Sequence, residues 1–236
     1  VIISVGAVAA VLYSRGYLAH CLAEKSPAHI SLHYTALVAM FYAMLGVVLS
    51  DGGFSFLFFW ELMTVASFLL ILFDAQRREV RRAALSYLIM MHIGFVLLVI
   101  GFVRLDAACG AATFGALGDY FRTQPGLPLL LVFLAGFGMK AGLFPMHVWL
   151  PEAHPAAPSH VSALMSGVMI KTGVYGILRV TAALGEQPLL HTAGVILLAA
   201  GVVTGLWGVI LAAMQNDVNG IAWCLADYLP DLGVKY

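Results

Sequence analysis

The chain has 236 residues, of which 62% are hydrophobic and only 10% are charged, and its mean hydropathy is +0.96. Soluble domains are usually about 45–50% apolar and about 25% charged, so this composition excludes an ordinary soluble domain and a disordered chain. Twelve Lys and Arg residues balance twelve Asp and Glu residues. This balance excludes a nucleic-acid-binding protein that works through a strongly basic surface.

Seven apolar stretches follow one another along the chain, separated by polar or Pro- and Gly-containing segments. Each has roughly the length of about 20 residues that a helix needs to cross the hydrocarbon core of a membrane. The stretches cover residues 2–17, 34–50, 54–73, 83–103, 127–150, 160–181 and 190–214. The sequence therefore predicts an all-α, polytopic bundle of about seven transmembrane helices, with residues 1–236 forming a single membrane domain.

The basic residues of the connections predict the orientation of this bundle. One set of alternating loops holds seven basic residues and the other set holds three. The more basic set is expected to face the cytoplasm, which places the N-terminus outside. The seven are Arg15, Lys25, Arg77, Arg78, Arg81, Arg82 and Lys235, and the three are Arg104, Arg122 and Arg179. The chain begins at Val1 and is apolar from there, so we expect it to be incomplete at its N-terminus.

Three ionisable residues, Glu61, Lys140 and Lys171, fall inside predicted helices near the middle of the membrane. A charge at that depth costs about 2.5–3.5 kcal/mol on insertion scales. Burial disfavours the charged form of either residue type, so a Lys–Glu pair inside the membrane is a candidate proton-transfer element. Two alternatives stay open: a static ion pair that fixes helix packing, and a lysine counter-ion in an anion transporter.

The segment between the two lysines predicts a broken helix. Pro145 lacks a backbone donor and its ring would clash with the carbonyl of Ala141, so the helix should end one turn after Lys140. Broken membrane helices mark ion pathways in transporters.

Three histidines, His147, His154 and His160, follow this break and are candidate relay residues, because histidine titrates near neutral pH. The alternative is that each is a hydrogen-bonded interfacial residue. Their spacings of seven and six residues match no zinc motif, and we predict no bound metal. His92 stands alone in the fourth stretch and is interpreted as a hydrogen-bonded core histidine, without a facing partner for a haem. Aromatic residues interpreted as an interfacial belt are Trp60, Trp149, Tyr87 and Tyr120.

Three segments resemble a known family. The run 59–63, Phe-Trp-Glu61-Leu-Met, resembles the glutamate-bearing helix of the antiporter-like subunits of respiratory complex I. The run 138–154, which begins Gly-Met-Lys140-Ala-Gly-Leu-Phe-Pro, resembles their broken, lysine-bearing helix. The continuation over 157–179 is most similar to the large membrane subunit of group 4 hydrogenases, as in hydrogenase-4 and formate hydrogenlyase.

The resemblance implies a fold and a role for the buried charges. Such subunits contain two inverted five-helix units, each with one broken helix. Residues of about 33–181 would form the first unit, and the second would be missing. In the family, Glu61 would pair with Lys140 as an electrostatic switch, and Lys171 would be the next member of a proton relay. Asn219 stands where the family usually has a lysine, and the chain stops at Tyr236. We expect either a degenerate or frameshifted gene, or a chain that is incomplete at its C-terminal end as well.

The function that the resemblance implies is proton translocation by a non-catalytic subunit of a group 4 hydrogenase or a related NADH/quinone oxidoreductase. Such a subunit holds no cofactor of its own. Its partners would be other membrane subunits, a peripheral redox arm and the lipid bilayer of a bacterial or archaeal inner membrane, with no nucleic acid. Two alternatives remain: a cation/proton antiporter subunit of the Mrp type, and a non-conducting scaffold.

Overall fold

The computed structural model describes residues 1–21 and 25–213 as a bundle of α-helices, and this part of the chain contains no β-strand. It confirms the predicted all-α, polytopic bundle. The expectations that concern residues 214–236, among them Asn219 and Lys235, lie outside the described residues.

Six helices in the described part are long and apolar enough to cross a membrane, and the shorter apolar helix α6 (Gly126–Ala141) accounts for the seventh predicted stretch. Four of them come first along the chain: α1 (Ile2–Cys21), α2 (Pro27–Leu49), α3 (Gly53–Ile71) and α4 (Arg78–Cys109). The fifth combines α8 (Ser159–Leu164), η2 (Met165–Met169) and α9 (Ile170–Ala182), and the sixth is α10 (Pro188–Ala213). The short elements are η1 (Leu72–Asp74), α5 (Leu117–Thr123) and α7 (Leu150–Ala156).

The predicted break in the fifth apolar stretch is present. Helix α6 ends at Ala141, and Gly142 takes a left-handed conformation with a φ of 72°, which glycine adopts without steric cost. The chain then passes through a turn before α7 begins at Leu150. The indole Nε1 of Trp149 donates a hydrogen bond of 2.9 Å to the carbonyl of Met139, which fastens this turn to the end of α6.

A second irregularity interrupts the next span. Residues 159–182 form one continuous helical segment, but Met165–Met169 is a π-helical turn between α8 and α9. Such turns are rare and occur frequently at functional sites. Both irregular segments therefore lie between Lys140 and Lys171 in the sequence, the break directly after the first lysine and the π turn directly before the second.

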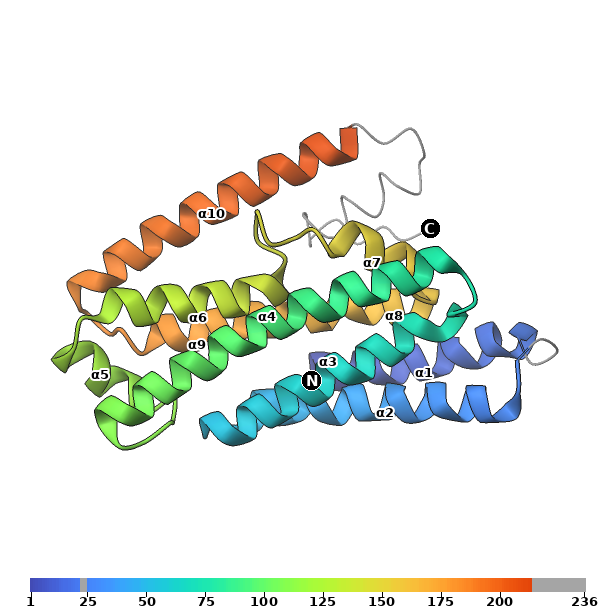
Figure 1. The fold of residues 1–236 in the computed structure, drawn as a ribbon, viewed down its shortest axis with the longest axis horizontal. Helices are drawn as coiled ribbons and strands as arrows, with labels where there is room; N and C mark the ends of the chain where they lie inside the picture. The colour runs from blue at the N-terminus through green and yellow to red at the C-terminus, as the bar shows by residue number, and fades with distance from the viewer. Residues whose placement is uncertain (22–24, 214–236) are drawn as a thin grey trace.

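Helix α6 lies between α4 and α9 and packs closely against both (Figure 1). A Cβ atom on Gly94 of α4 would lie 3.0 Å from the carbonyl oxygen of Gly136. A Cβ atom on Gly173 of α9 would lie 2.6 Å from the backbone nitrogen of Ala141. Small residues thus let the backbones approach one another, as is common between membrane helices.

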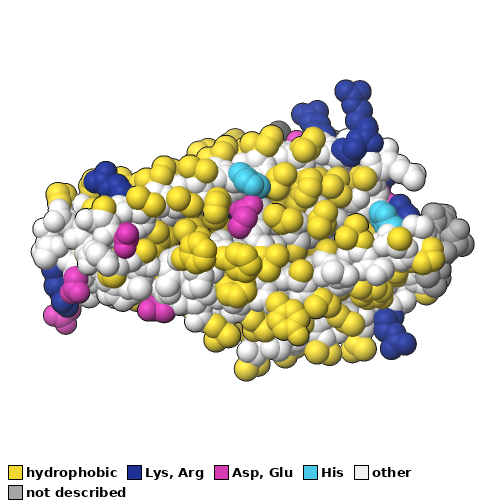
Figure 2. Space-filling model, turned by 60° about the horizontal axis from the view of Figure 1, so that its bottom comes forward, with side chains coloured by type: hydrophobic (Ala, Val, Ile, Leu, Met, Phe, Trp, Pro, Cys, Tyr) yellow, Lys and Arg dark blue, Asp and Glu magenta, His cyan; other side chains and the backbone are white. Residues whose placement is uncertain are grey.

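Charged residues fasten the connections at the two ends of the bundle. At one end, Lys25 pairs with Asp74 at 2.7 Å. At the other end, Arg179 pairs with Asp51 at 2.8 Å, and its guanidinium lies 3.8 Å from the ring centroid of Phe114. On the face shown in Figure 2, hydrophobic side chains cover the middle of the molecule, and lysines and arginines gather toward the ends. This distribution is that expected of a membrane protein.

Candidate functional site

Lys140 is the most deeply buried of the three predicted site residues. It lies in the last turn of α6, directly before the break, and it is only 1% exposed. Its Nζ donates a hydrogen bond of 2.8 Å to Oγ1 of Thr64 on α3 and lies 4.8 Å from the ring centroid of Trp60. The negative end of the α6 dipole and the aromatic face both stabilise a cation at this place.

Glu61 lies on α3 between these two contacts in sequence, but its carboxylate points elsewhere. Oε1 lies 3.0 Å from Nε2 of His92 on α4, and Oε2 is buried without a hydrogen-bond partner in the described part of the chain. No direct ion pair joins Glu61 to Lys140 among the described residues; Lys140 contacts Thr64 instead. The interpretation of His92 as a core histidine is wrong, because its side chain is 49% exposed at the bundle surface.

Lys171 occupies a different environment from Lys140. It lies on α9 and is exposed on the surface of the described chain, although its position is in the middle of the 159–182 span. Its Nζ donates a hydrogen bond of 2.5 Å to the carbonyl oxygen of Ser166, inside the π-helical turn. The π turn thus supplies a backbone acceptor to the lysine that follows it.

The three predicted relay histidines are buried, and the structure gives each a polar or aromatic neighbour. His147 lies in the turn after the break and stacks on Phe144, with ring centroids 5.5 Å apart. Nδ1 of His154 lies 3.0 Å from Oγ of Ser162 on α8. Among the described residues, no group of three or more His, Cys, Asp or Glu side chains is placed to hold a metal ion.

His160 contacts His33 on α2, a residue that the sequence did not indicate as part of the site. Its Nε2 lies 2.8 Å from Nε2 of His33 on α2, and both rings are buried. A contact between two imidazole nitrogens requires a proton on one of them. His33 is one of the two histidines of α2, the other being His29, and its position opposite His160 in space is what distinguishes it.

The aromatic residues assigned to an interfacial belt are instead buried in the protein, so that interpretation is wrong. Trp60 and Trp149 flank Lys140 and the break, as described above. The hydroxyl of Tyr87 lies 2.6 Å from Oγ of Ser67, and the Tyr87 ring lies 5.2 Å from that of Trp149. Tyr120 is buried beside Phe121. Hydropathy locates helix ends, but it does not show which residues there face other helices.

Comparison with known proteins identifies the family. Residues 50–222 match the family described as NADH:quinone oxidoreductase/Mrp antiporter, TM, and this chain belongs to that family. The predicted resemblance is thereby confirmed. The chain is a multi-pass membrane protein, and its relatives include both hydrogenase and antiporter subunits.

Three relatives show the range of similar proteins. The chain is 41% identical over 196 residues to an uncharacterized protein of Mycobacterium tuberculosis. The aligned residues cover 81% of this chain and 30% of that protein. It is 36% identical over 231 residues to hydrogenase-4 component B of Escherichia coli, covering 94% of this chain and 33% of the relative. It is 33% identical over 226 residues to a putative antiporter subunit of Staphylococcus aureus, covering 93% of this chain and 27% of the relative. The chain thus spans about a third or less of the length of these relatives.

Two solved structures share the fold. A chain of the membrane-bound sulfane sulfur reductase, an archaeal respiratory membrane complex, superposes with a TM-score of 0.76 at 19% identity, covering 82% of this chain and 40% of that one. A chain of the Mrp complex from a Dietzia species superposes with a TM-score of 0.73 at 24% identity, covering 83% of this chain and 22% of that one. Both neighbours are subunits of membrane complexes.

Proposed function

We propose that this chain carries protons through the membrane within a multi-subunit complex, and that Glu61, Lys140 and Lys171 are the residues that hold them. The observation that supports this proposal is the environment of Lys140. A lysine ammonium has three donors, and Lys140 is fully buried beside one hydroxyl and one indole ring. A static ion pair would place Glu61 against that ammonium, whereas Glu61 contacts His92.

A row of polar groups extends from Lys171 toward the end of the bundle at which α8 begins. Lys171 donates to the carbonyl of Ser166, whose hydroxyl donates to the carbonyl of Ser162 at 3.2 Å. Ser162 contacts His154, and His160, two residues before Ser162 on α8, contacts His33. Because a backbone carbonyl accepts a hydrogen bond but does not pass a proton on, we propose that the side chains of Ser166, Ser162, His154 and His160 line the route by which protons move between Lys171 and that end of the bundle.

For the complex to which the chain contributes, we propose a membrane-bound group 4 hydrogenase or a related quinone oxidoreductase of a bacterial or archaeal inner membrane. The likeness to hydrogenase-4 component B over 94% of the chain supports this assignment. In such a complex the partners are other membrane subunits and a peripheral redox arm. A cation/proton antiporter of the Mrp type is the second candidate, favoured by the similarity to the Staphylococcus aureus subunit.

The proposal is tested with two substitutions in the full-length protein, reconstituted with its complex in vesicles. We expect Glu61→Gln and Lys140→Met each to lower proton translocation by about tenfold or more, because each removes a group that must exchange a proton. Arg122→Gln is the control, since it removes an exposed charge at the end of the bundle. Wild-type translocation in both site variants would contradict the proposal. Sodium-dependent proton exchange without redox activity would assign the complex to the antiporter class.

A further inference from the structure

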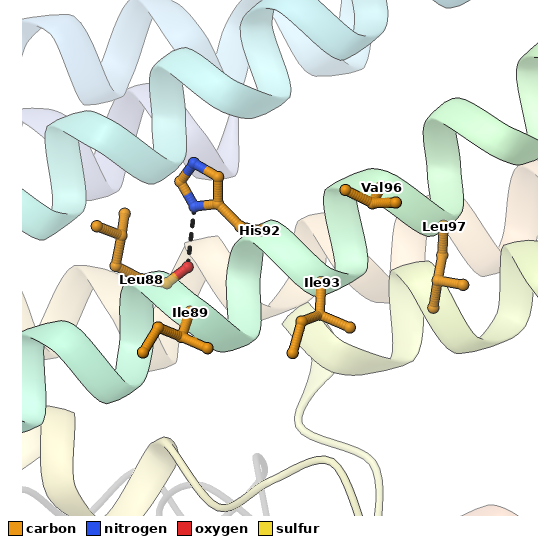
Figure 3. A pocket seen from close by; sticks show the side chains of 6 residues that line it. All are labelled: Leu88, Ile89, His92, Ile93, Val96 and Leu97. Atoms are coloured by element: carbon orange, nitrogen blue, oxygen red, sulfur yellow. Dashed lines mark hydrogen bonds between the residues drawn. The ribbon is translucent and has the colours of Figure 1, made fainter.

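The contact between Glu61 and His92 lies at the surface of the membrane-spanning bundle. His92 lies in a shallow groove of about 490 Å³ on α4, which is otherwise lined by Leu88, Ile89, Ile93, Val96 and Leu97. Figure 3 shows the imidazole turned toward the neighbouring helix, while the side chains of Ile89 and Ile93 point the other way. An ionisable pair on an apolar surface at this depth is costly, so it calls for a physical explanation.

The two ring nitrogens of His92 fix where its protons lie. Nδ1 is 2.9 Å from the carbonyl oxygen of Leu88, and a carbonyl can only accept a hydrogen bond, so Nδ1 carries a hydrogen. Nε2 is 3.0 Å from Oε1 of Glu61. If neither atom carried a proton, a nitrogen lone pair would face a carboxylate oxygen. One proton is therefore required between Nε2 and Oε1, on the imidazole or on the carboxyl group.

The presence or absence of this proton decides the charge of the pair. With it, the pair is neutral overall, either as a carboxylic acid beside a neutral imidazole or as a carboxylate beside an imidazolium. Without it, the pair carries a net negative charge in a groove lined by aliphatic side chains. Transfer of an unpaired charge into such surroundings is strongly unfavourable. On the face drawn in Figure 2, a histidine and an acidic side chain reach the surface together among hydrophobic side chains.

We propose that Glu61 and His92 form a proton-holding pair that exchanges one proton with Lys140, so that His92 is a further proton-carrying residue of the path. This inference rests on the proposed function. In the forward step, the Nε2–H bond of His92 breaks and an Oε1–H bond forms on Glu61. The carboxyl group then turns toward α6, its O–H bond breaks, and the proton binds Nζ of a neutral Lys140. The reverse steps return the proton to the pair, and no other reactant is needed.

The geometry allows this exchange because the second carboxylate oxygen of Glu61, Oε2, is available to accept a hydrogen bond. Oε2 is buried and has no hydrogen-bond partner in the described part of the chain. Glu61 follows Trp60 and precedes Thr64 by three residues on α3, and both of these residues contact the Lys140 ammonium. Glu61 is therefore carried by the same part of α3 that contacts the lysine, and we expect a rotation of its side chain to bring the carboxyl group from α4 toward Lys140.

Proton translocation by a matched pair of variants tests the role of His92. We expect His92→Gln to lower the rate by about tenfold or more, because it removes the imidazole that holds the proton. Ile93→Gln, which introduces the same amide into the same groove, should stay within about twofold of wild type, because Ile93 has no ionisable group to exchange a proton. A wild-type rate in His92→Gln, or an equal loss in both variants, would overturn the inference.

A second measurement reads the proton directly and does not depend on activity. In the wild-type complex with ¹⁵N-labelled histidine, solid-state NMR should show Nδ1 of His92 protonated and an Nε2 signal that shifts in Glu61→Gln. An unprotonated Nδ1, or an Nε2 signal with the same chemical shift in wild type and Glu61→Gln, would contradict a shared proton between His92 and Glu61. If Lys140→Met and Glu61→Gln abolish translocation while His92→Gln does not, this inference fails and the proposed function stands.

Discussion

The side chain of Lys140 is held by Thr64, which lies 76 positions earlier in the chain. The hydroxyl of Thr64 is the acceptor for its ammonium, and Thr64 also donates to the carbonyl of Trp60 at 3.1 Å. A hydroxyl can do both at once because it offers one donor and two acceptor sites. At the scale of single residues, therefore, Thr64 holds Lys140 in place by accepting one hydrogen bond from its ammonium.

Removal of this hydroxyl should destabilise the protein. Thr64→Val keeps the shape of the side chain but leaves a buried ammonium without its acceptor, which costs about 1–3 kcal/mol. We expect a lower melting temperature in detergent and slower proton translocation. Thr64→Ser retains the hydroxyl and serves as the control. Equal melting temperatures for the two variants would show that the hydrogen bond contributes nothing to stability.

Among the helices, the close contact between α6 and α9 brings the two lysine-bearing segments together. Gly173 of α9 lies against the backbone of Phe137 and Ala141, where a Cβ atom would be 2.8 Å from a carbonyl oxygen and 2.6 Å from an amide nitrogen. These are backbone atoms at the end of a helix and cannot move aside as a side chain would. The position of the helix end that carries Lys140 therefore depends on the absence of a side chain on α9.

A single methyl group at this contact should separate the helices. We expect Gly173→Ala to lower the free energy of unfolding by about 1–3 kcal/mol, as overpacking usually does. Gly201→Ala on α10 is the matched control, because a Cβ atom there meets nothing within 4 Å of the described chain. Thermal unfolding in detergent measures the difference. Equal stability of the two variants would mean that α6 and α9 are not packed as closely as described.

The two ends of the bundle are expected to lie on opposite sides of the membrane. The α3–α4 connection and the start of α2 lie at one end, and α5 and the end of α9 lie at the other (Figure 1). The first end holds Lys25, Asp74 and Arg78, and the second holds Asp51, Arg122 and Arg179. Because six described helices are long enough to span, each end is exposed to its own aqueous compartment. The distribution of basic residues in the sequence predicts that the end with Arg78 is cytoplasmic.

Labelling of single cysteines tests this arrangement. The chain contains three native cysteines, which are first replaced by serine. We expect Arg78→Cys to react with a membrane-impermeant maleimide only from the cytoplasmic side, and Arg122→Cys only from the opposite side. Both residues are exposed, so neither substitution should disturb the bundle. Labelling of both from one side would contradict the arrangement of the helices across the membrane, and exchanged sides would reverse the predicted orientation.

The sequence by itself determined the features that depend on local chemistry. Apolar stretches of spanning length predict the membrane helices, and Pro145 predicts the break after Lys140, because its missing donor acts within one helical turn. The cost of a charge in the hydrocarbon core singles out Glu61, Lys140 and Lys171 as site candidates. Their roles in proton transfer stay predictions that the variants described above would test.

Only the tertiary structure decided which side chains meet. Hydropathy places a residue at a depth, but it does not specify the rotation of a helix about its axis or the identity of its neighbours. For this reason the sequence did not place His92 against Glu61 or His33 against His160, and it assigned Trp60 to the membrane interface rather than to the site. These contacts join different helices and depend on packing between their surfaces.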